Sequence, residues 1–119
     1  MATLNNILGQ QDFIRHKKGD IFNKAFSVET IATLTNVKTL FALTGFNALF
    51  TICKKQGSVA LYSKTLADAT VLTFASNSFT INDNLTLGDG DYYFSLVITN
   101  AVTPAIVYTL WFGTFHIEL

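Results

Sequence analysis

The sequence predicts an all-β protein, an antiparallel β-sandwich of about seven to nine strands behind an extended N-terminal arm. Three observations predict this class. Apolar and polar side chains alternate with a period of two along most of the chain, which is the pattern of a strand. Turn residues interrupt the alternation at the spacing typical of a sandwich. Threonine is abundant, and β-branched side chains suit half-exposed strands.

The chain has the length of one domain. It contains 119 residues, of which 50% are hydrophobic and 13% are charged, and domains cluster at about 100–150 residues. We expect an arm over residues 1–11 and the sandwich over residues 12–119. The arm is amide-rich, and its apolar residues Leu4, Ile7 and Leu8 are expected to dock on a partner. The low charged fraction also predicts that other subunits cover part of the surface.

The first half of the chain contains four clear alternating segments, 13–17, 21–28, 46–53 and 58–65. A corner at residues 18–20 separates the first two, and the sequence Lys-Lys-Gln-Gly at 54–57 is typical of a hairpin turn. The Thr-rich segment 29–42 fits strand less well, so it predicts one short strand and a connection.

The second half predicts strands over 71–74, 78–81, 92–99 and 106–119. The third of these has the cleanest alternation, with Tyr92, Phe94, Leu96 and Ile98 on one face. In the last strand, the large residues fall on even numbers up to Phe112 and on odd numbers after Gly113. A change of phase at a glycine predicts a β-bulge or a strand bend at that position.

The charge balance argues against several partners. Eight basic and eight acidic residues give zero formal net charge, so nucleic-acid binding is not expected. No apolar run approaches the roughly 18 residues of a membrane helix, so no membrane partner is expected. Residues 1–60 are basic and residues 61–119 are acidic, which reflects either surface solvation alone or head-to-tail association of unlike surfaces.

The residues that carry catalysis are scarce. Cys53 is the single cysteine and is interpreted as core filling, while His16 and His116 are interpreted as surface or edge-strand histidines. The loop 83–91 has oxygen-bearing side chains between glycines, as in calcium sites, but turn chemistry explains the same residues. We therefore expect no enzymatic activity, no metal and no cofactor.

Interface residues are predicted instead. Arg15, Lys17 and Lys18 are expected to contact an acidic subunit or to protect a strand edge from unwanted pairing. Tyr93 and Trp111 lie on the parity opposite the main apolar face, which favours an exposed aromatic pair. Such a pair suits a subunit interface, with a sugar-binding platform as the alternative.

Several motifs occur in a familiar order: Lys-Lys-Gly-Asp at 17–20, Leu-Thr-Gly-Phe at 43–46, Gly-Asp-Tyr-Tyr-Phe-Ser-Leu at 90–96 and Tyr-Thr-Leu-Trp-Phe-Gly-Thr-Phe-His-Ile-Glu at 108–118. This order resembles the immunoglobulin-like N-terminal domain of phage baseplate upper proteins and related small structural proteins of tailed-phage virions. The resemblance spans nearly the whole chain from Phe13 onward.

The resemblance implies an immunoglobulin-like sandwich and a non-enzymatic accessory structural protein of a tailed-phage virion. Capsid decoration, head-fibre attachment and a place in the tail or baseplate are all compatible with it. It also implies that the partners are capsid or tail subunits, that several copies assemble together, and that the protein resides in a virion assembled in the host cytoplasm. The alternative function is a carbohydrate-binding or adhesive sandwich that uses Tyr93 and Trp111.

Overall fold

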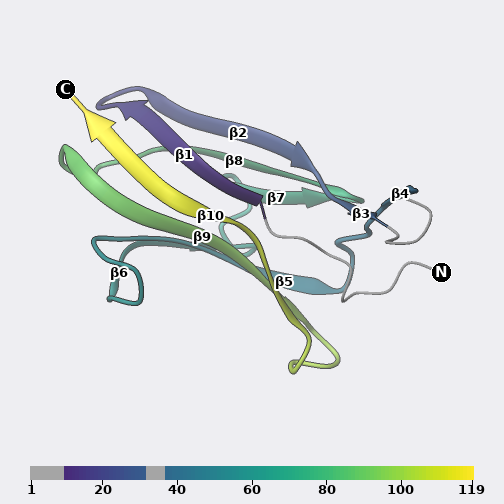
Figure 1. The fold of residues 1–119 in the computed structure, drawn as a ribbon. Coiled ribbons are helices and arrows are strands. Elements are labelled where there is room, and N and C mark those ends of the chain that lie inside the picture. Colours follow the sequence, from purple (N-terminus) through teal and green to yellow (C-terminus); the bar gives the residue numbers. More distant parts are fainter. Residues whose placement is uncertain (1–9, 32–36) are drawn as a thin grey trace.

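The computed structural model describes residues 10–31 and 37–119, and this part of the chain is all-β (Figure 1). The described residues form ten strands and no helix. The strands are β1 (Gln10–Lys17), β2 (Ile21–Ser27), β3 (Glu29–Ile31), β4 (Lys38–Leu40), β5 (Phe46–Cys53), β6 (Ala60–Thr65), β7 (Leu72–Ala75), β8 (Ser78–Asn84), β9 (Gly90–Asn100) and β10 (Val107–Glu118). The predicted all-β class is confirmed.

Two main sheets form the molecule in an arrangement compatible with a β-sandwich. The larger sheet has five strands in the order β1-β10-β9-β5-β6, and the smaller has three in the order β2-β8-β7. Strands β3 and β4 pair only with each other. Both strands fall in the segment 29–42, for which the sequence predicted one short strand and a connection. They bring the number of strands among the described residues to ten, above the predicted seven to nine.

The pairing of β1 with β10 is parallel, whereas all other pairings of the described strands are antiparallel. The prediction of a purely antiparallel fold is therefore wrong at this edge. At the end of this pairing lies the predicted corner, where the amide of Lys18 donates to the carbonyl of Glu118 at 2.7 Å and Gly19 has a φ of +93°. After this corner the chain enters the smaller sheet, so β1 and β2 lie in different layers (Figure 1).

Strand β1 begins at Gln10, so the last two residues of the predicted arm belong to the larger sheet. The rest of the arm, including Leu4, Ile7 and Leu8, lies outside the described residues.

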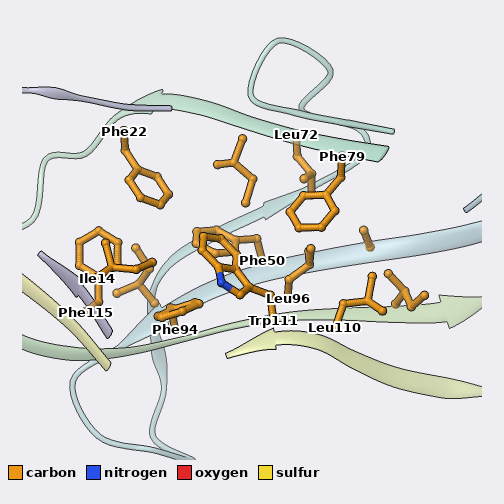
Figure 2. Packing of buried hydrophobic residues seen from close by; sticks show 14 of the residues in the cluster. Ile14, Phe22, Phe50, Leu72, Phe79, Phe94, Leu96, Leu110, Trp111 and Phe115 are labelled. Atoms are coloured by element: carbon orange, nitrogen blue, oxygen red, sulfur yellow. The ribbon is translucent and has the colours of Figure 1, made fainter. Parts of the chain in front are cut away.

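The core lies between the two main sheets (Figure 2). The strict alternation predicted for β5 and β9 is confirmed, because Phe50 and Ile52 on β5 and Leu96 and Ile98 on β9 are fully buried. The smaller sheet contributes Phe22, Leu72, Phe79 and Ile81 to the same cluster. Burial of these large side chains supplies the main driving force for folding.

The position of Trp111 contradicts the sequence prediction, which placed this residue on the surface. Its side chain is only 2% exposed and stacks against both Phe22 and Phe50, so it is a core residue and cannot serve as a surface platform. The cause is a bulge. Thr109 pairs with Val97 and Trp111 pairs with Leu96, which are adjacent residues, so Leu110 is the additional residue. Both Leu110 and Trp111 are buried as a result.

The alternation of inner and outer residues in β10 therefore changes phase at Leu110. The sequence predicted this change at Gly113. Gly113 has a different role, because a Cβ atom at this position would lie 1.9 Å from the carbonyl oxygen of Asp12. The glycine allows the backbone of β1 to approach β10.

His16 lies on the edge strand β1, which is one of the two positions that the sequence predicted, but it is not a surface residue. It is 8% exposed and packs against the rings of Phe22 and Phe115. Its Nε2 atom donates to the carbonyl oxygen of Asp20 at 3.1 Å. This hydrogen bond satisfies the buried ring nitrogen and ties β1 to the corner that follows it.

Candidate interaction surface

The outer face of the larger sheet, on the side away from the smaller sheet, is the candidate site. Cross-strand pairing arranges its side chains in four rows. The rows are listed here in the direction from β1 to β6. The first row is Phe13, Thr114, Tyr93 and Cys53, and the second is Gln11, Phe112, Ser95, Thr51 and Ser63. The third row is Thr109, Val97, Leu49 and Thr65, and the fourth is Val107, Thr99 and Asn47. We refer to these residues as the outer face.

None of the residues of the outer face carries a charge. The face consists of aromatic and aliphatic side chains between hydroxyl and amide groups, and the hydroxyls of Thr51 and Ser95 bond to each other at 3.1 Å. Surfaces of soluble proteins are usually rich in charged residues, and depletion of charge is a mark of interface cores. The composition of this face is therefore typical of a protein contact.

Several large side chains on the outer face are open to solvent. Phe13 is 65% exposed, Val107 50%, Leu49 42% and Tyr93 39%. Single exposed apolar residues are common, but a group of them on one uncharged face indicates an interaction site.

A hollow occupies the middle of the outer face. It has a volume of about 460 Å³, and its lining includes Tyr93, Phe112, Cys53 and the turn residues Gln56 and Gly57. Tyr93 and Phe112 come from neighbouring strands, while the β5–β6 turn closes one side. The hollow is open to solvent, and it is lined in part by Thr114, Tyr93 and Cys53, which belong to the row that contains Phe13.

Charged groups limit the outer face at one end. The next row contains Arg15, His116 and Asp91. Arg15 forms an ion pair with Glu118 at 2.9 Å, and the Nδ1 atom of His116 donates to Asp91 at 2.5 Å. The first and second halves of the chain, which differ in net charge, thus meet here within one molecule. Exposed pairs of this kind contribute little to stability.

The predicted interface residues have different positions. Tyr93 is exposed on the outer face, Arg15 lies on the charged row, and Lys17 and Lys18 are exposed beyond it. The structure therefore brings Arg15, Lys17 and Lys18 together at one end of β1 but separates Trp111 from Tyr93. Without Trp111 the predicted aromatic pair does not exist on the surface.

Sequence reasoning missed Phe13 and Phe112. A usable signal was present for Phe13, because it shares its parity with Arg15 and Lys17, which favour solvent. For Phe112 no such signal existed, because the bulge at Leu110 reverses the face on which it lies.

The described residues do not gather into a metal site. In residues 10–31 and 37–119 no group of three or more His, Cys, Asp and Glu side chains could hold a metal ion. Within the loop considered for calcium, Asp83 accepts a hydrogen bond from Tyr62 at 2.6 Å, while Asp91 is bonded to His116. The carboxylates of Asp83 and Asp91 therefore serve separate partners.

Burial raises the pKa of Tyr62 above its usual value, and the hydrogen bond to Asp83 and the negative charges of Asp83 and Asp68 raise it further. Tyr62 lies on β6 and Asp83 on β8, so this hydrogen bond joins the two main sheets. Its role is structural.

Among the described residues, no helix has the length and apolar character needed to span a membrane. No protein-family model matches the chain, and no curated protein matches its sequence.

Proposed function

We propose that this chain is a non-enzymatic structural protein of a tailed-phage virion and that it docks on neighbouring subunits through the outer face. The observation that carries the proposal is the combination of an uncharged face with an exposed Phe13, Tyr93 and Leu49. Covering such a face takes no ionic group out of water, and its hydroxyl and amide groups can form hydrogen bonds with the partner.

The resemblance of the sequence to the immunoglobulin-like domain of baseplate proteins is the reason for proposing that the protein is part of a virion. The strand order supports an immunoglobulin-like topology, since β5, β9 and β10 adjoin in one sheet and β2, β8 and β7 form the other. A second feature supports it. The hydroxyl of Tyr92, near the start of β9, donates to the carbonyl of Gly88 at 2.8 Å, as in the tyrosine corner of immunoglobulin-like sandwiches.

The basic residues at the end of β1 favour a partner with an acidic surface. Lys17 and Lys18 are exposed beyond the outer face, and rim charges of one sign guide association with an acidic neighbour. We propose capsid or tail subunits as the partners, with decoration, head-fibre attachment and a baseplate position as the sites at which this docking operates.

Two measurements test the proposal. Purified particles of the phage that encodes the chain are analysed by quantitative mass spectrometry, and the chain is expected at a fixed number of copies per particle. Particles are then assembled with Phe13→Asp, which is expected to be lost from them while remaining folded. Absence of the wild-type chain from purified particles would contradict the proposal.

A further inference from the structure

We propose that the outer faces of two copies of this chain pack on each other about a two-fold axis, with Phe13 of each copy entering the hollow of the other. The inference rests on the proposed docking role of the same face and makes a second copy of the chain the subunit that covers it. Capsid or tail subunits then contact the dimer outside this face, where Lys17 and Lys18 are exposed.

Charge is the first argument. In a two-fold interface the same patch meets itself, so any charged residue near the axis lies close to its own copy or to another group of that patch. The outer face has no charged residue in any of its four rows. At the charged end, Arg15 is neutralised by Glu118 and His116 is bonded to Asp91. Self-association therefore places no charged side chain of the four rows against the second copy.

Hydrogen bonding is the second argument. The polar groups of the face are mostly hydroxyls, as in Thr51, Ser95 and Thr114, together with the amide of Gln11. A hydroxyl or an amide group both donates and accepts, so two identical faces can satisfy each other. A face of carboxylates alone or of ammonium groups alone has no such property.

Shape is the third argument. Phe13, at the edge strand, is 65% exposed and protrudes beside a hollow of about 460 Å³ that is lined by Tyr93 and Phe112. A cavity of roughly 150 Å³ accommodates a benzene molecule, so the hollow has room for a phenyl ring. A projection and a hollow on one face are complementary to the same face of a second copy, and aromatic rings are favoured anchors of such contacts.

Analytical ultracentrifugation of a dilution series tests the proposal. Wild type is expected to be a concentration-dependent dimer, and Phe13→Asp and Tyr93→Asp are expected to weaken dimerisation by about 30-fold or more, as for interface hot spots. The matched control is Ile21→Asp. Ile21 is 66% exposed, as Phe13 is, but lies on β2 of the smaller sheet, so its variant is expected to dimerise like wild type.

Thermal melts followed by circular dichroism confirm that each variant is folded. Where an aspartate variant is unfolded, Phe13→Ser and Tyr93→Ser replace it, because they remove the ring without adding a charge.

Cys53 provides an independent readout. It is the single cysteine of the chain, is half-buried and lines the hollow. Alkylation of its thiol by N-ethylmaleimide is expected to slow as the wild-type concentration rises, while in Phe13→Asp the rate is expected to stay constant.

A wild type that remains monomeric throughout the series, or an alkylation rate that does not depend on concentration, would overturn the dimer. If Phe13→Asp is nevertheless lost from particles, the docking function of the face stands and its partner is a different subunit. If the dimer forms but the wild-type chain is absent from particles, the virion function fails and the dimer stands.

Discussion

The indole Nε1 of Trp111 donates a hydrogen bond to Oδ2 of Asp12 at 2.6 Å, and thereby joins the last strand of the chain to the first. The indole is otherwise enclosed by aromatic rings, with the ring centroid of Phe94 at 4.6 Å and that of Phe26 at 4.8 Å. Because buried polar groups need partners, Asp12 is what allows a tryptophan to occupy the middle of this core.

Asp12→Ala is expected to lower the free energy of unfolding by about 1–3 kcal/mol, because the buried indole N–H loses its acceptor. Urea unfolding measures the change. The emission of Trp111, the single tryptophan, reports the transition. Asp89→Ala, in the exposed loop before β9, is the control and is expected to change stability by less than about 0.5 kcal/mol. Equal stability of the two variants would contradict the assigned hydrogen bond.

Gly113→Ala is expected to destabilise the protein by about 2–4 kcal/mol, since the new methyl group collides with the carbonyl of Asp12 and the φ of +149° disfavours a side chain. Gly57→Ala is the matched control. Gly57 also has a positive φ, of +82°, but a methyl group added there would meet no atom within 4 Å, so only about 1 kcal/mol is expected.

Hydrogen exchange locates the damage in Gly113→Ala. The amides of β1 are expected to lose protection before those of β5 and β9, because β1 is the strand displaced by the collision. Uniform loss of protection across the larger sheet would count against this explanation.

Phe50→Ala is expected to cost about 3–5 kcal/mol, because Phe50 is fully buried between the sheets and its removal leaves a cavity. Leu61→Ala is the comparison. Leu61 lies on the neighbouring strand β6 but is 55% exposed, so a much smaller loss is expected. Similar melting temperatures for the two variants would show that the assignment of inner and outer faces is wrong.

Stability is expected to fall at alkaline pH partly through Tyr62. Its pKa is raised in the folded state, so the unfolded chain releases the phenol proton first, and the stabilisation present below about pH 10 is lost as the pH rises further. Tyr62→Phe removes this group together with its hydrogen bond to Asp83. The variant is expected to be less stable at neutral pH and to lose less stability than wild type between about pH 8 and about pH 11. Parallel pH profiles would contradict the assignment.

The parts of the fold that the sequence predicts well are those in which local alternation coincides with burial. In β5 and β9 every second residue faces the core, and both strands are paired on both sides, so Phe50 and Leu96 could be assigned from parity alone. The parallel pairing of β1 with β10 joins residues about a hundred positions apart, and no local pattern contains that information.

The candidate site also contains residues that local alternation predicts and residues whose positions depend on strand pairing. Parity predicts an exposed Tyr93 because β9 has no irregularity, and Tyr93 is exposed. Parity misplaces Trp111 because the run Leu110-Trp111-Phe112 fits two phases equally well, and only the pairing with β9 shows which residue is the bulge. The outer face as a whole emerges only when five strands are aligned side by side.

Cryo-electron microscopy of the assembly that contains this chain shows whether the outer face is the docking surface. We expect protein density from a neighbouring copy or subunit to cover the outer face, with Phe13 and Tyr93 enclosed. Density that leaves this face open to solvent, with contacts made through the smaller sheet, would contradict it.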